Sequence, residues 1–398
     1  MEAVKLLPQS KILQEWWQEV KDNFWEDDAK REVKKLVKEL MESTMKEELS
    51  VYLGRGEYER SSNTPSYRNG YYKRSLVTQF GTIDEIKVPT LRNASFNTKV
   101  FKRYKRHQDI VEDLIEDIFI AGVSTRRVGA AISKLLDVKI SHGTVSNITR
   151  RLDRKVKEFH KRPLIDEYQY LLLDGITLKI RYNGKYHNRK VLSAYGITLF
   201  GQRRLLAFMQ SQGESSNAWE GLLNSLYNRG LKGNNLKLIT IDGAGGLHSA
   251  IEVIYPNILI QRCWAHKLRN VSNYLKKRYQ DDCIEDARGI YKAKNKHLAL
   301  AEFKNWKKMW VKKVPKAVHC LEKDLEELLN HFDCPEKHRI RIRTTNVIER
   351  SFKEVRRRTR VFSCFSNRQS CDRIIYAIFT HLNNQWENKP IKEFTEFA

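Results

Sequence analysis

Apolar side chains recur every three or four residues in the first 53 residues, and this spacing predicts a helical region. Between residues 27 and 49 the repeat forms one stripe on a charged helix, made of Val33, Leu36, Val37, Leu40, Met41 and Met45. Such a stripe must bury against another helix or another subunit. Little in the neighbouring sequence offers a cover, so the stripe is either intramolecular core or a self-association surface.

Residues 54–100 contain many turn-forming residues, with short β-like runs at 73–77 and 82–88 on either side of Phe80-Gly81. A basic stretch follows at residues 98–107. It is either a solvated face or an arm that contacts phosphates. Its candidate contacts are Lys102, Arg103, Lys105 and Arg106.

Residues 109–160 are predicted to form helices separated by short breaks. The first helix ends at Gly122, and Ser124 and Ser141 are placed to cap the next two. Two short helices, a tight connection and a polar final helix are typical of a helix-turn-helix, although an ordinary helical hairpin has the same pattern. The candidate DNA contacts are Arg126, Arg127, His142, Thr144, Ser146, Asn147, Arg150 and Arg151.

From residue 168 the hydrophobic period changes to that of strands. Three strands are predicted at 168–182, 190–200 and 203–210, joined by turns at Asn183-Gly184 and Gly201-Gln202. A helix capped by Ser216, a strand at 236–242, a short helix and a strand at 257–262 follow. This order predicts an α/β layer architecture and matches that of a ribonuclease-H-like fold.

Residues 264–338 interrupt that order and are predicted to be an all-helical insertion. Within it, Trp306 and Trp310 lie four apart on one helix face, as core residues or, alternatively, as base-stacking wedges. A further helix follows at residues 344–362. The predicted divisions are a helical region at 1–60, a small β-rich and basic region at 61–107, the helix-turn-helix at 108–162, the first part of the α/β core at 166–264, the insertion at 265–340 and the C-terminal helices of the core at 341–398.

Two acidic residues stand at predicted strand positions where their carboxylates would meet. Asp174 follows three leucines on the first strand, and Asp242 ends the fourth strand, which should lie beside the first. Two such carboxylates repel unless a cation lies between them, and oxygen ligands suit Mg²⁺ or Mn²⁺. With a third acid they would form a site for two metal ions that supports phosphoryl transfer. Glu349 and Glu354 both qualify, but they diverge by about 140° around a helix, so only one can face the metals.

The glycines after Asp242 also fit a nucleic-acid site. Gly243 and Gly245-Gly246 are expected to leave room for a phosphate backbone to approach the metals.

Charge and composition point to the same kind of partner. The 398 residues include 73 Lys and Arg against 48 Asp and Glu, a net charge of +25. This excess favours a polyanion, most simply nucleic acid. No apolar run approaches the length of a membrane span, and the N-terminus lacks a signal-peptide core. The six cysteines have no disulfide-framework spacing, so we expect a cytoplasmic, nucleoid-associated protein.

These motifs together resemble the Mutator-type insertion-sequence transposases, over nearly the whole chain. The resemblance is carried by GVSTRRVGAAISKLLDVKISHGTVSNITRRL (122–152), by DGITLKI (174–180), and most specifically by IDGAGGLHSAI (241–251) with YPNILIQRCWAHKLRNV (255–271) and TTNVIERSFKEVRRRTRV (344–361). It implies a ribonuclease-H-like core with a helical insertion, metal-dependent cleavage and joining of element-end DNA, a copy-out and paste-in route, and a dimeric complex. It also implies a catalytic triad of Asp174, Asp242 and Glu349, the last in an Asn-x-x-Glu-Arg motif with Asn346 and Arg350. Many relatives have an acid or a histidine where this chain has Gly245-Gly246.

Two further groups of residues flank the predicted site. Cys263 and His266 match the Cys-x-x-His motif of the same family. They act near the site, or only pack in the core, or bind zinc together with Cys334 and His338. Basic residues follow Glu349 and are either a solvated helix face or groups that hold the DNA strand. They are Lys353, Arg356, Arg357, Arg358 and Arg360.

The sequence therefore predicts a DNA transposase that binds terminal inverted repeats and target DNA. We expect it to act as a homodimer with two Mg²⁺ or Mn²⁺ ions per site. Two rivals share the same fold. One is a DNA-binding regulator without activity, derived from a transposase, and the other is a structure-selective nuclease with no joining step.

Overall fold

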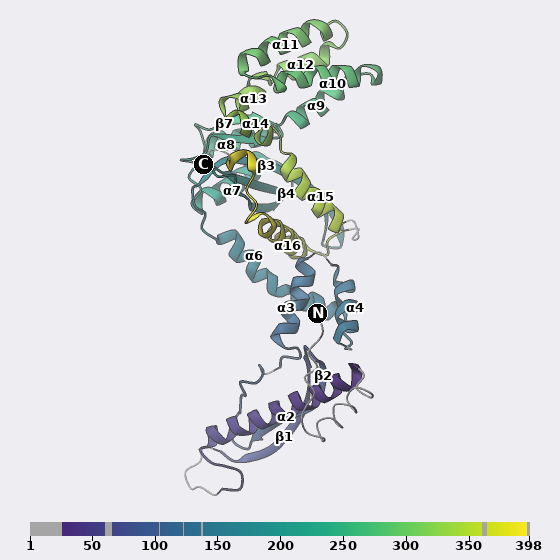
Figure 1. Cartoon of the computed structure of the whole chain (residues 1–398), viewed down its shortest axis with the longest axis vertical. Coiled ribbons are helices and arrows are strands. Elements are labelled where there is room, and N and C mark those ends of the chain that lie inside the picture. Colours follow the sequence, from purple (N-terminus) through teal and green to yellow (C-terminus); the bar gives the residue numbers. More distant parts are fainter. Residues whose placement is uncertain are drawn as a thin grey trace, which may run out of the picture. The chain divides into compact units, whose positions relative to one another are not determined.

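The computed structural model describes residues 26–59, 66–102, 104–121, 123–136, 138–359 and 364–395 (Figure 1). The chain divides into two compact units, one within residues 1–119 and 123–150 and the other within residues 120–122 and 151–398. Each unit is described by itself. Residues 1–25 of the predicted N-terminal helical region and Gly122, the predicted end of a helix, lie outside the described residues.

The first unit begins with a long helix packed on a β-hairpin. Helix α2 (Glu26–Leu53) lies against the antiparallel strands β1 (Arg68–Thr78) and β2 (Gly81–Leu91), which are longer than the predicted runs. The hairpin covers Met41 and Met45, so the expectation that little nearby could cover the stripe was wrong. The stripe is only partly buried, because Leu36 and Leu40 remain 63% and 67% exposed.

The same unit contains the helices predicted around residues 109–150, except for Ile120 and Arg151 at their ends, which belong to the second unit. They are α3 (Asp109–Ile120), α4 (Thr125–Leu136), α5 (His142–Ile148) and the 3₁₀ turn η1 (Thr149–Arg151), after which α6 (Leu152–Lys161) begins in the second unit. Ser141 caps α5 as predicted, its side chain accepting from the backbone N–H of Thr144 at 3.1 Å. The predicted continuous helix from Ser141 is broken, because η1 separates α5 from α6.

The second unit is built on a five-stranded mixed sheet. Its elements after α6 are β3 (Tyr168–Tyr182), β4 (Lys185–Thr198), β5 (Arg203–Ser211), α7 (Ser216–Asn228), β6 (Leu238–Ile241), α8 (Gly245–Ile254) and β7 (Leu259–Arg262). The strand order is β5-β4-β3-β6-β7, so β3 is central and β6 lies beside it, as predicted. Asn183 and Gly184 form the two-residue turn between β3 and β4, with positive φ angles of 48° and 77°.

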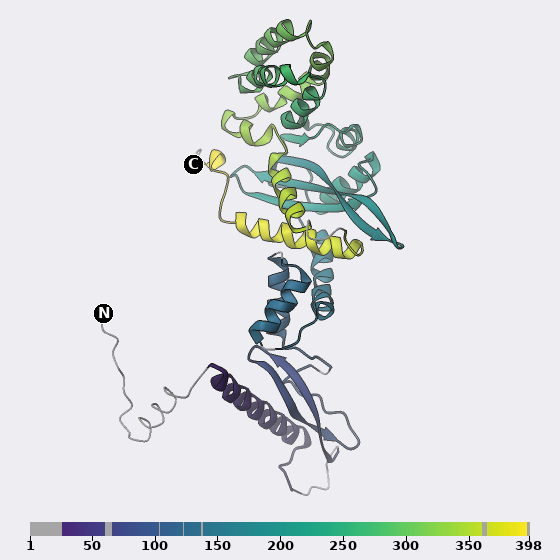
Figure 2. The same cartoon turned by 90° about the vertical axis from the view of Figure 1, so that its right-hand side faces the viewer.

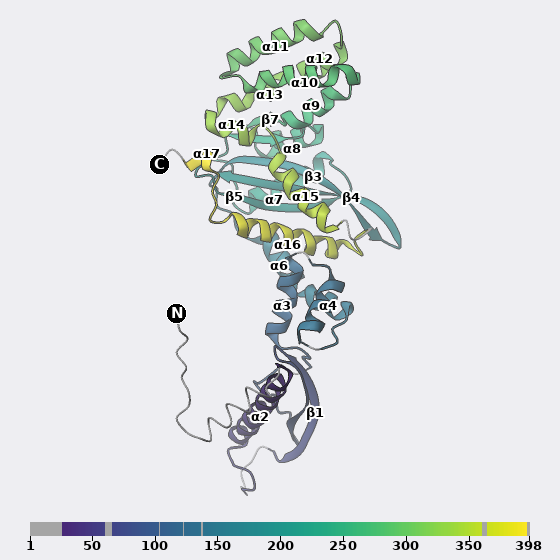
Figure 3. The same cartoon turned by 45° about the vertical axis from the view of Figure 1, so that its right-hand side comes forward.

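Two hydrophobic cores lie on opposite faces of this sheet (Figure 3). One core joins Tyr170 and Leu172 of β3 to buried residues of α6, α15 and α16. The other joins Leu171 and Leu173 to α7 and α8. Alternate residues of β3 therefore face different helices, because side chains alternate across a strand. The cap of α7 is Ser215, not Ser216, since the Ser215 hydroxyl accepts from Ala218.

A helical insertion separates β7 from the last helices, as the sequence predicted. It comprises α9 (Trp264–Ser272), α10 (Lys277–Lys292), α11 (Lys296–Trp310), α12 (Pro315–Glu322), α13 (Leu325–Leu329), the 3₁₀ turn η2 (Asn330–Asp333) and α14 (Glu336–Ile342). Trp306 and Trp310 are core residues of this insertion rather than exposed wedges. The chain then returns to the sheet with α15 (Asn346–Thr359), α16 (Arg368–Trp386) and α17 (Lys392–Thr395). Among the described helices, none has the length and apolar content needed to cross a membrane.

Candidate active site

Asp174 lies on the central strand and points to the face that α15 covers. It shares that face with Leu172 and Ile176, both of which pack against α15 and α16. The carboxyl is buried, with 6% of the residue exposed, and its Oδ1 accepts from the backbone N–H of Gly175 at 2.7 Å. Burial, reinforced by the charges of Asp242 and Glu349, raises the pKa of Asp174 to about 7.

Asp242 directly follows the neighbouring strand β6. The parallel register pairs Leu172 with Thr240, so Asp174 and Asp242 each lie two residues further along and on the same face. Asp242 Oδ1 accepts from the backbone N–H of Ala244 at 3.1 Å. Asp242 is close enough to Asp174 for its charge to raise the pKa of that carboxyl.

Glu349 reaches the same place from α15. Its neighbours Ile348 and Phe352 are buried in the core beneath the helix, which fixes the direction of the helix face that carries Glu349. Glu349 Oε1 lies 3.2 Å from His266 Nε2 and 3.8 Å from a guanidinium nitrogen of Arg269. Glu354, the alternative acid, instead binds Arg357 at 2.7 Å.

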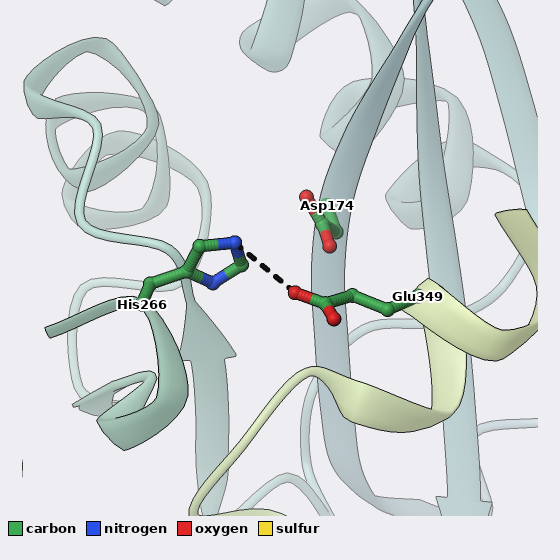
Figure 4. Close-up of side chains that lie close together, drawn as sticks. All are labelled: Asp174, His266 and Glu349. Carbon is green, nitrogen blue, oxygen red and sulfur yellow. Dashed lines mark ion pairs between the residues drawn. The ribbon is translucent and has the colours of Figure 1, made fainter. Parts of the chain in front are cut away.

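Donor atoms of Asp174, His266 and Glu349 all lie within 4.8 Å of one another, and Figure 4 shows the three side chains converging from β3, α9 and α15. These three side chains are close enough to one another to hold a metal ion. Among the described residues, Asp242 is not part of this close group. Two carboxylates and an imidazole are ligands that suit a divalent cation.

A hydrogen-bonded network behind His266 fixes its ring. Thr345 donates from its backbone N–H to Cys263 Sγ at 3.3 Å, and its hydroxyl lies 3.5 Å from His266 Nδ1. The hydrogen bond with Cys263 and the nearby negative charges outweigh burial and raise the pKa of His266 to about 9. Burial alone would raise the pKa of the Cys263 thiol, but hydrogen bonds from His266 and Thr345 prevail and lower it.

The zinc alternative for Cys263 and His266 was wrong. His338 donates to or accepts from Tyr170 at 2.9 Å and stacks on Phe394, and Cys334 belongs to the same core as Tyr170. These two residues do not join Cys263 and His266 in a ligand group of the described residues.

The glycines after Asp242 serve different purposes, and the expectation that all three leave room for a phosphate backbone was wrong. Gly243 has a φ of 99°, and a Cβ there would lie 2.9 Å from the guanidinium of Arg262. A Cβ on Gly246 would lie 2.8 Å from the backbone nitrogen of Ser216, so this glycine allows α8 to pack against the start of α7. Only at Gly245 would a Cβ meet open space.

Arg262 is a residue near the site that sequence reasoning missed. It ends β7, donates to the carbonyl of Gly243 at 3.3 Å, and is 2.6 Å from Glu327 and 3.2 Å from Asp324 of the insertion. The guanidinium therefore ties the turn after Asp242 to α13 and its preceding residue. The sequence could have indicated Arg262, because it ends the predicted strand that follows the strand of Asp242.

A groove of about 680 Å³ opens beside the site in the second unit. Its lining includes Trp264, Arg269, Arg288, Arg343 and Asn346. Asn346 is exposed at the start of α15, so the Asn-x-x-Glu-Arg motif lines the groove at one end and supplies Glu349 one turn later.

The basic residues that follow Glu349 lie mainly on the exposed side of α15. Arg350, Lys353 and Arg356 are exposed, and Arg357 is bound by Glu354. Arg360 lies outside the described residues, as does the side chain of Arg358.

The candidate DNA contacts of the first unit are mostly exposed. Exposed side chains include Lys102, Arg106, Arg126, Arg127, His142, Asn147 and Arg150, whereas Thr144 and Ser146 are half-buried. Arg151, at the end of η1, is also exposed and belongs to the second unit. Lys105 is largely buried and pairs with Asp109 and Glu112, and Arg103 lies outside the described residues.

A cavity of about 1160 Å³ in the first unit gathers basic side chains. Arg74, Lys102, Arg106, Lys139 and Thr144 contribute to its lining, which contains no acidic side chain among the residues that the structure describes. This surface has the charge that a nucleic-acid backbone requires.

Comparison with known proteins identifies the class. Residues 9–389 match the family described as Transposase, Mutator family. The chain is 33% identical over 354 residues to the transposase for insertion sequence element ISRM5 of Rhizobium meliloti (strain 1021), which covers 89% of this chain and 88% of the relative. It is 34% identical over 357 residues to the transposase for insertion sequence element IS256 in transposon Tn4001 of Staphylococcus aureus, covering 89% and 90%. The corresponding values for the transposase of insertion sequence element IS406 of Burkholderia multivorans (strain ATCC 17616 / 249) are 33% over 350 residues, 87% and 89%.

The chain belongs to the Mutator family of transposases. Such a family implies an enzyme that cleaves and transfers DNA, and therefore DNA as a partner. The resemblance seen in the sequence motifs is thus confirmed at the level of the family.

Proposed function

We propose that this chain binds the terminal inverted repeats of an insertion sequence and cleaves and joins DNA strands with Asp174, Asp242 and Glu349, using two Mg²⁺ or Mn²⁺ ions. The observation that carries the proposal is that donor atoms of Asp174, Glu349 and His266 lie within 4.8 Å of one another. Asp242 follows the end of β6, the strand that pairs with β3 beside Asp174. Order in the sequence and adjacency of β3 and β6 support a ribonuclease-H-like core.

The chemistry of the donors fits divalent ions. Asp174 and Glu349 offer hard oxygen ligands, and burial beside other carboxylates raises the pKa of Asp174, a setting in which a bound cation would favour the charged form. The three acids would hold the metals, with His266 as a ligand or as the partner of Glu349. Bound there, the ions would stabilise negative charge on the attacking and leaving oxygens of an in-line phosphoryl displacement.

The protein residues around the acids would position the reacting groups. His266, held by Thr345 and Cys263, keeps Glu349 pointing towards Asp174. Arg269 lies 3.8 Å from Glu349, and the exposed Arg350 follows Glu349 in the chain; both would hold the DNA strand by its phosphates. Water would attack the first phosphodiester, and the 3′-hydroxyl so released would attack the second by the same displacement.

Recognition of the element ends would fall to the first unit. The exposed polar start of α5, the exposed arginines of α4 and the basic cavity support a helix-turn-helix with an adjoining phosphate-binding arm. The exposed Leu36 and Leu40 on α2 support the expected homodimer, since isolated apolar stripes favour a partner helix.

A strand-transfer assay on oligonucleotides that end in the element's repeats tests the proposal. We expect Asp174→Asn, Asp242→Asn and Glu349→Gln each to abolish cleavage and joining in Mg²⁺ while binding to the repeats persists. Glu354→Gln is the matched control and should retain activity, because its carboxylate pairs with Arg357 away from Asp174.

The same assay separates the rival functions. Cuts without joined products would favour a structure-selective nuclease, and binding without either would favour an inactive regulator. If Asp174→Asn still joins strands, the assignment of the acids is wrong.

A further inference from the structure

The hairpin of β3 and β4 extends beyond the rest of the sheet. Pairing of β3 with β6 covers Tyr170–Leu172, and pairing of β4 with β5 covers Lys190–Ser211 to Ile197–Arg203. The two strands nevertheless stay paired with each other as far as the Asn183-Gly184 turn. Residues 176–190, here called the hairpin arm, therefore form a two-stranded ribbon that projects at the right-hand side of Figures 2 and 3.

The hairpin arm is strongly basic. No Asp or Glu occurs between Gly175 and Gly213, whereas the arm itself carries five Lys and Arg residues, which are Lys179, Arg181, Lys185, Arg189 and Lys190. Lys190 pairs with Glu214 at 2.9 Å. Lys179, Arg181 and Lys185 are exposed, and no described acidic side chain forms an ion pair with them. Three uncompensated cations on a ribbon of this size call for an anionic partner.

Basic side chains occupy both faces of the ribbon. Lys179 and Arg181 lie on one face, across from Asn188 and Tyr186, while Lys185 lies on the other face across from Tyr182. Tyr186 is 65% exposed. The face of Lys185 is covered by the protein core at Ile180, so a partner can reach it only near the turn, whereas the face of Lys179 and Arg181 is open.

The arm is held in place by contacts of its outer half with Phe365. The backbone N–H of Arg181 donates to Phe365 at 2.8 Å, and the N–H of Phe365 donates to Lys179 at 2.9 Å. Ile180 and Phe365 are buried in the same core as α15, the helix that carries Glu349. The cations of the arm thus have a fixed position relative to the candidate active site.

We propose that the hairpin arm lies in a groove of the duplex DNA that flanks the phosphate held at the candidate active site, and that Lys179, Arg181 and Lys185 bind phosphates on both strands there. The inference rests on the proposed function. The major groove of B-DNA, about 12 Å wide, admits a two-stranded β-ribbon. Lysine and arginine contacts to phosphates position DNA independently of its sequence.

The length of the arm fixes where the contact falls. Asn183 lies nine positions after Asp174 on one strand, and at about 3.3 Å per residue the arm reaches about 30 Å. At about 3.4 Å per base pair, this corresponds to about nine base pairs of duplex on one side of the cleaved phosphate.

The test is the salt dependence of DNA binding by the full chain. The variant K179A/R181A/K185A is compared with wild type and with K304A/K308A/K312A, which removes the same charge from exposed positions on and after α11. Fluorescence anisotropy is measured from 50 to 200 mM salt on a duplex that extends 15 base pairs beyond the cleavage site. The slope of log K against log salt should fall in magnitude by about 2 to 3 in the arm variant, at about 0.9 for each lost phosphate contact. It should fall by less than about 1 in the control.

Shortening the DNA provides an independent measurement. On a duplex cut back to four base pairs on the side that the arm contacts, wild type should show the reduced slope of the arm variant, and the variant should not change further. Shortening the other side should leave the difference between the two proteins intact. An unchanged slope in the arm variant, with a melting temperature equal to that of wild type, would overturn the inference.

Cleavage by wild type is measured on the same duplexes to separate this inference from the proposed function. If wild type cleaves normally and the salt slope of the arm variant is unchanged, the proposed DNA contact of the hairpin arm is wrong and the proposed function stands. Absence of cleavage and joining by wild type overturns the proposed function.

Discussion

Replacing Asp174 with asparagine should stabilise the metal-free protein while removing its activity. The pKa of this buried carboxyl is about 7 in the folded protein against an ordinary value of 3.8. The difference of about 3 units corresponds to about 4 kcal/mol, at about 1.4 kcal/mol per unit, which the folded state loses when the carboxyl ionises. Asparagine has nearly the same shape and does not ionise.

The effect has a defined pH window. Below about pH 4 both the folded and the unfolded protein hold the proton, so the wild type and the Asn variant differ little. Between about pH 4 and pH 7 the unfolded chain releases the proton and the folded chain keeps it, so the stability of the wild type falls as pH rises. Above about pH 7 the difference reaches its full value in favour of Asp174→Asn.

Differential scanning calorimetry in EDTA at pH 5 and pH 8 measures this difference. For a unit of this size, about 2–4 °C accompanies each kcal/mol, so the melting temperature of the variant should exceed that of wild type by up to about 8–16 °C at pH 8 and by less at pH 5. Adding Mg²⁺ should raise the melting temperature of wild type and narrow the gap, because a bound cation stabilises the ionised carboxyl.

An exposed acid serves as the matched control. Asp282→Asn, on the exposed side of α10, should leave the melting temperature unchanged at both pH values. If Asp174→Asn melts at or below the temperature of wild type at pH 8 without metal, the burial and charge reasoning for this site is refuted.

Substitutions at three further positions, Glu349, Arg262 and Trp306, test other parts of the structure. Glu349→Gln should abolish strand transfer in an oligonucleotide assay, whereas Glu354→Gln should retain most of it, and loss of activity in both would mean that the helix face is wrongly assigned. Arg262→Gln removes the donor to the Gly243 carbonyl and should reduce strand transfer about 10- to 100-fold, or raise the Mg²⁺ concentration needed by a similar factor, with repeat binding unchanged. Arg262→Lys should recover part of that loss, and no change in the Gln variant would contradict the positioning role. Trp306→Ala should lower the free energy of unfolding, measured by denaturant titration, by about 3–5 kcal/mol. The reason is that Trp306 is 1% exposed and its indole N–H donates to the carbonyl of Cys283. A loss below about 1 kcal/mol would contradict its core position.

The sheet could be predicted from the sequence because its signals are local. Alternating residues and the Asn183-Gly184 turn defined β3 and β4, and the strand order followed from the succession of strands and helices. The cover over Met41 and Met45 could not be predicted, because it comes from a hairpin that begins more than twenty residues later. The hydrophobic pattern of a helix shows which of its faces is apolar, but it does not show which distant segment covers that face.

From the residues alone the sequence singled out Asp174 and Asp242, whereas Glu349 was chosen over Glu354 by the family resemblance. Asp174 and Asp242 stand out because charged residues are rare in buried strands. The approach of His266 to Glu349 joins the first helix of the insertion to the helix that follows the insertion, and no local spacing encodes it. The packing role of Gly246 likewise depends on the start of α7, which the sequence places some thirty residues earlier.

The helical insertion delays completion of the site during synthesis. The chain leaves the sheet at Arg262 and returns only at Asn346, after α9 to α14, before Glu349 can meet Asp174. On the proposed assignment, a translation product that stops early, or a fragment released by a protease within the insertion, carries the DNA-holding half and lacks the last carboxylate. Such a fragment would bind the element ends without cleaving them, and so would act as a dominant-negative inhibitor of the full-length protein in the same cell.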